Sequence, residues 1–271
     1  SIKKRYRVNS IYSFNVPRMF SAMRKSVLYI NGGGTLIQNA TSRRSLWYYL
    51  FTLRLAKFLG NKVDMYGCGI GPVRGEKNIR LVKKVLNRSV DTITLREKDS
   101  MTELESFGVK RPEILLSSDP ALVLTPSSQL DVDIYLKKHG LQAGQKYICF
   151  MLRTWQGFED KASAFASCAD RAYEQYGMTP VFLSLNIFHD TSAAQKVAQK
   201  MKAPFHILDD WAEPELLIGL LGHMDVVVSM RLHGLIFSSL SGVPLVGVAY
   251  DPKIGSFLKY LEAGTCIELG D

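Results

Sequence analysis

Three basic side chains stand just after short aliphatic runs, where their chemistry suits an anionic ligand. Arg96, His233 and Lys253 each follow a segment of the kind that forms a buried strand. Arginine binds carboxylate or phosphate through two parallel hydrogen bonds, and imidazole exchanges protons near neutrality. The three cations therefore predict a site for a small anion that carries both a carboxylate and a phosphate. For Arg96, the structural alternative is a surface ion pair at a helix start capped by Asp99 or Ser100.

His233 is the strongest acid/base candidate. The segment Val226–Ile236 indicates a buried strand that runs directly into a helix carrying His233. A helix N-terminus favours neutral imidazole and bound anions together, whereas a histidine on an apolar face is usually a hydrogen-bonded core residue. Arg231, which lies two residues earlier, either assists catalysis or makes a structural ion pair. The other histidines lack such neighbours: His139, His189, His206 and His223.

A glycine-rich segment follows the first expected strand, Val27–Ile30. Glycines let the backbone approach a ligand closely and leave successive N–H groups free for an anion or for hydroxyl groups. The spacing matches neither a dinucleotide-binding motif nor a P-loop, and the structural alternative is a tight strand-to-helix turn. A second turn of this kind is expected at Gly67–Pro72. The residues expected to bind the acceptor or an anion are Gly32, Gly33, Gly34, Thr35, Gln38 and Asn39.

Short aliphatic runs alternate twice with amphipathic segments, which predicts two Rossmann-like α/β domains with parallel sheets. The expected strands are Val27–Ile30, Val63–Gly67, Thr92–Leu95, Ile114–Leu116, Tyr147–Leu152, Val181–Leu185, Phe205–Ile207, Val226–Ser229 and Leu245–Val248. The expected helices are Ser45–Leu59, Lys77–Leu86, Asp99–Phe107, Lys161–Tyr176, Thr191–Met201, Glu213–Leu221 and Leu232–Leu240. The polar segment Thr125–Gln129 is the expected linker between residues 1–125 and 126–271. Since such sheets bind ligands at the carboxyl ends of their strands, we expect the site in a cleft that the domains face.

Composition narrows the function classes. The 271 residues include 46% hydrophobic and 22% charged residues, which suits an ordered two-domain protein. The net charge of +9 indicates anionic ligands, but no RNP-like pattern accompanies it, so nucleic acid is not an expected partner. The four cysteines lie far apart, which predicts neither a metal site nor a disulfide framework. This cysteine usage fits a reducing cytosol, so a cytoplasmic protein is expected. No run reaches the ~18 apolar residues of a membrane span, so the protein is expected to be soluble or to lie at most on a membrane surface.

Several of these segments together resemble the polysaccharide pyruvyltransferase family, and within it the CsaB type. The matching segments are Gly32–Gln38, Ser45–Leu50, Gly67–Pro72, Thr94–Glu97, Asp119–Ala121 and Ser229–Gly234. Members usually open with a further strand and a glycine-rich turn, so the first domain is expected to be incomplete at its N-terminus.

The resemblance implies a GT-B-like fold and transfer of pyruvate from phosphoenolpyruvate, with no other cofactor. The implied acceptor is ManNAc in a lipid-diphosphate-linked disaccharide of a secondary cell-wall polymer, and the product is a 4,6-pyruvate ketal. The first domain would then be the acceptor side and the second the donor side. His233 is the implied catalytic residue, and Arg96, Lys253 and Arg231 are implied donor contacts alongside it.

Two other functions remain open on sequence alone. One is a nucleotide-sugar-dependent glycosyltransferase of the same fold, and the other is a non-catalytic cell-wall sugar-binding protein that uses Trp155 and Trp211 as platforms. We also expect peripheral contact with an anionic membrane at the inner face of the plasma membrane, close to the aromatic run Trp47–Tyr49. The basic residues expected to make it are Lys3, Lys4, Arg5, Arg7, Arg43 and Arg44.

Overall fold

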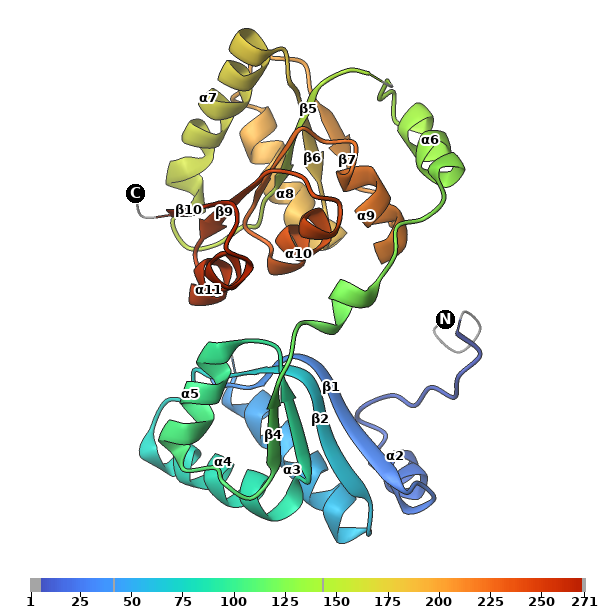
Figure 1. The fold of residues 1–271 in the computed structure, drawn as a ribbon, viewed down its shortest axis with the longest axis vertical. Helices are drawn as coiled ribbons and strands as arrows, with labels where there is room; N and C mark the ends of the chain where they lie inside the picture. Colours follow the sequence, from blue (N-terminus) through green and yellow to red (C-terminus); the bar gives the residue numbers. More distant parts are fainter. Residues whose placement is uncertain (1–5, 41, 143, 270–271) are drawn as a thin grey trace. The chain divides into compact units, whose positions relative to one another are not determined.

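The computed structural model describes residues 6–40, 42–142 and 144–269. The chain forms two compact units, Ser1–Pro120 and Ala121–Asp271, each built on its own parallel sheet (Figure 1). The sequence placed this division slightly later, between residues 125 and 126. Among the described residues, no helix combines the length and apolar character that a bilayer crossing requires.

The first unit is a four-stranded parallel sheet in the order β1-β2-β3-β4. Its strands are β1 (Leu28–Ile37), β2 (Lys62–Ile70), β3 (Thr92–Leu95) and β4 (Glu113–Leu116). Its helices are α2 (Val16–Arg24), α3 (Arg43–Phe58), α4 (Glu76–Ser89) and α5 (Lys98–Phe107). Because successive strands are neighbours and right-handed crossovers are the rule, α3, α4 and α5 belong on the same face.

Alternation along the strands gives this first sheet one buried and one exposed face. Val63 and Met65 of β2 are fully buried in the core that α3, α4 and α5 share with the sheet. Leu28, Ile30 and Tyr66 occupy the alternate positions and are exposed. The period of two in a strand thus turns one set of side chains toward the helices and the other set away from them.

The second unit is a six-stranded parallel sheet in the order β10-β9-β8-β5-β6-β7. Its strands are β5 (Tyr147–Met151), β6 (Thr179–Leu183), β7 (His206–Leu208), β8 (Val226–Ser229), β9 (Leu245–Ala249) and β10 (Thr265–Glu268). Its helices are α6 (Gln129–Lys138), α7 (Phe158–Tyr176), α8 (Ile187–Ala198), α9 (Pro214–Leu221), α10 (Leu232–Leu240) and α11 (Pro252–Leu261). The chain runs outward from β5 to β7, then returns to β8 and runs outward the other way.

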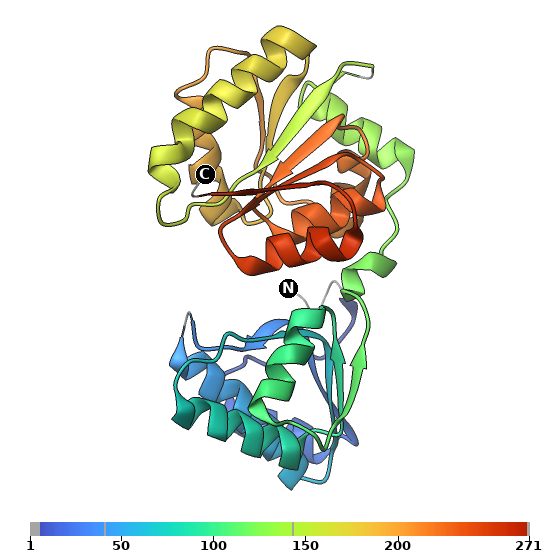
Figure 2. The same cartoon turned by 60° about the vertical axis from the view of Figure 1, so that its left-hand side comes forward.

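Helices cover both faces of this second sheet, as Figure 2 shows for the yellow α7 and the red α11. Phe150 of β5 packs with α7 and α8, whereas Cys149 and Met151 pack with α9, α10 and α11 on the other face. Every residue of β5 is therefore buried, as expected for a central strand of a doubly wound sheet.

All nine expected strands and all seven expected helices are present, most with ends shifted by a few residues. The first strand differs more, because it was expected to end at Ile30 and β1 ends at Ile37. The sequence did not predict α2, α6, α11 or β10. The expected linker is shorter than predicted because Gln129 already begins α6, with Ser128 capping the helix.

Candidate functional site

The carboxyl ends of β5 and β8 mark the candidate site in the second unit. These strands are hydrogen-bonded neighbours, and the chain direction along the sheet reverses between them. Open α/β sheets bind ligands in the crevice at such a switch point. Arg153 follows β5 there, and the segment Met230–His233 follows β8.

The N-terminus of α10 lies directly against these strand ends. Gly234 in its first turn makes this possible, since a Cβ there would lie 2.5 Å from Ser229 Oγ and 2.7 Å from Met151 Sδ. Arg231 is the residue that caps the helix, and it makes no side-chain capping hydrogen bond. The positive end of the α10 dipole is thereby held at the switch point, where it favours an anion.

His233 is exposed in the first turn of α10, and its ring centroid lies 6.0 Å from that of Phe237. The alternative interpretation, a core histidine, is wrong because the side chain is exposed. Its catalytic role stays a prediction. An exposed imidazole can exchange protons with a ligand without supporting the fold.

Arg231 is bound to Asp190 of α8, a carboxylate that is only 2% exposed. Arg231 Nε donates to Asp190 Oδ2 at 3.1 Å, and a second guanidinium nitrogen donates to Oδ1. The backbone N–H of Asn186 also donates to Asp190, at 2.9 Å. This geometry matches the structural ion pair that the sequence left as one of two alternatives for Arg231.

Lys253 lies in the first turn of α11, and its Nζ is 3.0 Å from Asp251 Oδ2. Tyr250, which directly follows β9, lies between Lys253 and Arg153. Lys253 Nζ is 6.0 Å from the centre of the Tyr250 ring, and Arg153 Nη1 donates to the Tyr250 hydroxyl at 2.9 Å. The Arg153 guanidinium also lies 5.1 Å from the centre of the Trp155 ring. β9, β8 and β5 lie side by side in the parallel sheet. Lys253 and Arg153 therefore lie at the same carboxyl edge as His233.

Arg96 belongs to the first unit and is 8% exposed. Its Nη1 lies 2.9 Å from Asp119 Oδ2, and its Nη2 donates to Thr35 Oγ1 at 3.2 Å. The alternative of a surface ion pair is wrong about exposure, because Arg96 is buried and pairs with the buried Asp119 after β4. A pair at the helix start is nevertheless present, since Arg96 Nε lies 3.7 Å from Glu97 Oε2. The cap of α5 also differs, since Glu97 occupies the N-cap position and Ser100 donates to its side chain.

The glycine-rich segment is not a strand-to-helix turn. Gly32, Gly33, Gly34 and Thr35 lie within β1, where Gly34 pairs with Cys68 of β2. Gly33 and Gly34 have φ of +50° and +75°, and the register shifts between Gly34 and Ile37. Among the described residues, β1 is an edge strand with β2 on one side only, so binding of an acceptor or anion through its backbone N–H groups stays a prediction. The proposed second turn is similar, because Gly67–Ile70 belongs to β2.

Asn39 has a structural task. Its side chain accepts from the backbone N–H of Arg74 and donates to the Arg74 carbonyl, both at 2.8 Å. It therefore fixes the loop after β2 to the segment after β1.

A sequence profile of the polysaccharide pyruvyl transferase family matches residues 1–252. The chain belongs to this family. It is therefore a transferase, and membership supports pyruvyl transfer onto polysaccharide. A search of curated protein sequences gave no significant match.

Solved structures similar to this pyruvyl transferase have GT-B-like folds, which confirms the expected fold class. HepE from Anabaena, in complex with UDP and glucose, is 13% identical, with a TM-score of 0.59 over 94% of this chain and 68% of that one. The UDP-GlcNAc 2-epimerase from Methanocaldococcus jannaschii is 11% identical, with a TM-score of 0.63 over 96% and 72%. MnaA from S. aureus with UDP is also 11% identical, with a TM-score of 0.62 over 96% and 69%. At these identities the likeness concerns the fold alone.

Sequence analysis missed Arg153 in this pyruvyl transferase, although the signal was present. Arg153 follows the buried strand β5 just as Arg96 follows β3. For the nearby Trp155, the sequence suggests only a sugar platform. The structure instead places the indole ring 4.7 Å from the Tyr250 ring, beside the Arg153 guanidinium.

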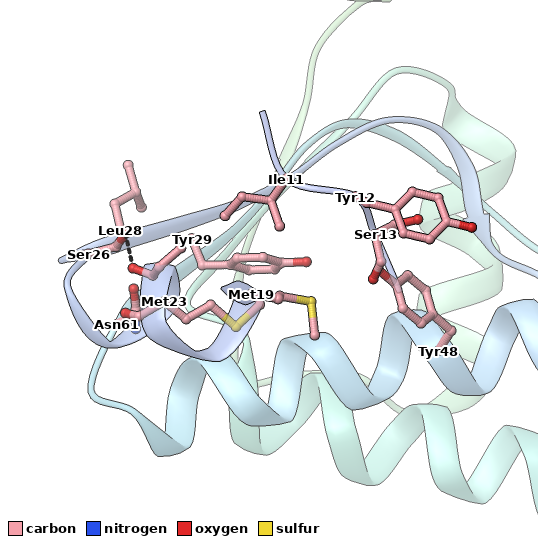
Figure 3. A pocket seen from close by; sticks show the side chains of 11 residues that line it. Ile11, Tyr12, Ser13, Met19, Met23, Ser26, Leu28, Tyr29, Tyr48 and Asn61 are labelled. Atoms are coloured by element: carbon pink, nitrogen blue, oxygen red, sulfur yellow. Dashed lines mark hydrogen bonds between the residues drawn. The ribbon is translucent and has the colours of Figure 1, made fainter. Parts of the chain in front are cut away.

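The first unit of the pyruvyl transferase also has an apolar pocket of about 320 Å³ beside β1 (Figure 3). The Tyr29 ring lies within it, with Ile11 on one side and Met19 on the other. Burial raises the pKa of Tyr29, and it also raises the pKa of Tyr48, which is the less buried of the two. Both hydroxyl groups therefore stay protonated at neutral pH. The pocket therefore offers an apolar wall with neutral hydroxyl groups. Tyr48 in this lining belongs to the aromatic run Trp47–Tyr49 that was expected to lie near a membrane.

Proposed function

We propose that this chain moves the pyruvyl group of phosphoenolpyruvate onto ManNAc of a lipid-diphosphate-linked disaccharide, giving a 4,6-pyruvate ketal as in the CsaB type. The observation that carries the proposal is the exposed His233 at the N-terminus of α10, at the switch point of the second sheet. Arg153 and Lys253 stand at the same carboxyl edge. The second unit is thus the proposed donor side and the first the acceptor side.

The reaction needs a group that both gives and takes a proton. The methylene carbon of phosphoenolpyruvate gains one proton, and two sugar hydroxyl oxygens form bonds to the central carbon as the bond to phosphate oxygen breaks. The hydroxyls release two protons, of which one balances the new methyl group and the other leaves with phosphate. His233 fits this task because imidazole exchanges protons near neutrality. No cofactor beyond phosphoenolpyruvate enters this balance.

Arg153 and Lys253 are the proposed contacts of the donor's carboxylate and phosphate. The Arg153 guanidinium and the Lys253 ammonium group lie at the strand ends. There they can stabilise the negative charge that builds up on the departing phosphate. Arg96, which the sequence named as a main donor contact, and Arg231 remain proposed donor contacts. We place both behind Arg153 and Lys253, because each is already bound to a buried carboxylate.

The proposed setting is the cytoplasmic face of the plasma membrane, where the lipid-linked acceptor presents its sugar. Arg7, Arg43 and Arg44 are exposed, as a contact with anionic lipid requires. Lys3, Lys4 and Arg5 lie outside the described residues.

The test is phosphate release from phosphoenolpyruvate that depends on a ManNAc-containing diphosphate acceptor, with the ketal identified by mass spectrometry. Acceptor-dependent release supports the proposal. Thermal stabilisation by UDP-sugars without any by phosphoenolpyruvate would instead favour a nucleotide-sugar glycosyltransferase. Sugar binding with no turnover of phosphoenolpyruvate would favour a non-catalytic binding protein.

A further inference from the structure

A basic pocket of about 610 Å³ lies at the carboxyl ends of β1 and β2 in the first unit. These strands are neighbours, and they lead into α3 and α4, so the N-termini of two helices approach the same place. Its polar lining includes Asn39, Arg43, Arg74, Lys77, Asn78 and Arg80. The four basic side chains, which come from α3, the loop after β2 and α4, are all exposed to solvent.

Hydrogen bonds fix the loop that shapes this pocket. Asn39 holds both the N–H and the carbonyl of Arg74, and Asn78 Nδ2 donates to the same carbonyl at 2.8 Å. Gly75 then turns the chain into α4 with a φ of +88°, and no side chain caps the helix there. The loop is therefore preorganised, and the first turn of α4 presents its positive dipole end beside the cations.

We infer that this pocket binds a diphosphate group. Its four cations face a single lining carboxylate, Glu76, which lies 3.1 Å from Arg80 Nη2. The lining therefore keeps a net positive charge that favours a multiply charged anion. Its volume falls in the range of about 300–1,000 Å³ that small-molecule sites have, which exceeds the needs of one phosphate. Arginine and lysine are the usual ligands of phosphoryl oxygens.

This inference rests on the proposed function only for the source of the diphosphate, which is the lipid-linked acceptor. The pocket lies in the first unit, whereas His233, Arg153 and Lys253 lie in the second. The phosphate of phosphoenolpyruvate is the other source with the same chemistry, so the experiment must separate the two.

The first measurement is calorimetric titration of the full chain with inorganic pyrophosphate. The variant Lys77→Gln/Arg80→Gln should bind pyrophosphate at least 10-fold more weakly than the natural chain. The matched control is Lys84→Gln/Arg88→Gln, which removes the same two charges from exposed positions of α4 outside the pocket. Equal weakening in both variants, or no pyrophosphate binding by the natural chain, would overturn the inference.

The second measurement assigns the source by steady-state kinetics. Lys77→Gln/Arg80→Gln should raise KM for the diphosphate acceptor at least 10-fold and leave KM for phosphoenolpyruvate within twofold. A rise in KM for phosphoenolpyruvate alone would overturn the acceptor assignment. Since pyrophosphate binding is measured without turnover, a failed pyruvyl transfer assay refutes the proposed function and leaves the pocket to be judged by titration.

Discussion

Replacement of His233 by glutamine should abolish turnover while the fold stays intact. Loss of a general acid/base costs about 10²- to 10⁴-fold in rate, which is about 3 to 5 kcal/mol of transition-state stabilisation. The stability change should be much smaller, because the side chain is exposed and lies outside the core. Exposed substitutions usually change the free energy of unfolding by less than about 0.5 kcal/mol. For a unit of this size that is a Tm shift of roughly 2 °C at most.

The assay is phosphate release at saturating acceptor, paired with thermal unfolding and titration of phosphoenolpyruvate. His223→Gln is a suitable control, because His223 precedes β8 and therefore lies at the opposite edge of the sheet from His233. The control should keep full activity. If His233→Gln keeps a third of the natural rate, the acid/base role is wrong, and if the variant unfolds, the histidine is structural after all.

Three further predictions concern ion pairs and packing in the second unit. Arg231→Met should destabilise the chain by about 3 kcal/mol in urea unfolding because it leaves the buried Asp190 charge unpaired, and adding Asp190→Asn should restore part of the loss; an undiminished loss in the double variant would count against the ion pair. Gly234→Ala should cost about 1 to 3 kcal/mol by the same measurement, because the new methyl group would overlap side chains beneath α10; unchanged stability would mean that the helix can move. Asp210, which follows β7, accepts hydrogen bonds from Lys138 and Tyr135 of α6. Although burial raises the pKa of Asp210, these hydrogen bonds outweigh burial and lower the pKa from 3.8 to about 2. Its contribution to stability is therefore present above pH 3.8 and lost as the pH falls toward 2, so Asp210→Asn should flatten this part of the acid unfolding profile.

Sequence reasoning located the strands well because buried parallel strands are short aliphatic runs with polar flanks. It missed β10, whose segment Thr265–Glu268 is exposed at the sheet edge and has no apolar run. It also missed α6 and α11, which follow Ser128 and Asp251 as capping residues that resemble ordinary loop residues in sequence. Periodicity reports burial, so the fully exposed β10 escapes it.

The candidate site could be predicted only in part. His233 and Lys253 were found because each follows an aliphatic strand, and that position alone places them at the carboxyl edge. The burial of Arg96 depended on Asp119, which lies 23 residues away, and no local pattern announces such a partner. The strand conformation of Gly32–Gly34 likewise depends on pairing with β2, a long-range contact that overrides the local preference of glycine for turns.

The exposed face of the first sheet affects how the protein behaves in solution. Leu28, Ile30 and Tyr66 lie on that face in contact with water, where Lys62 and Asp64 occupy the paired positions opposite Leu28 and Ile30. At low ionic strength the net charge of +9 keeps molecules apart. Salt shortens the range of this repulsion to about 8 Å near 0.15 M, while it leaves apolar attraction in place. The colloidal stability of the chain should therefore fall as salt rises, with molecules associating through this sheet face until something apolar covers it.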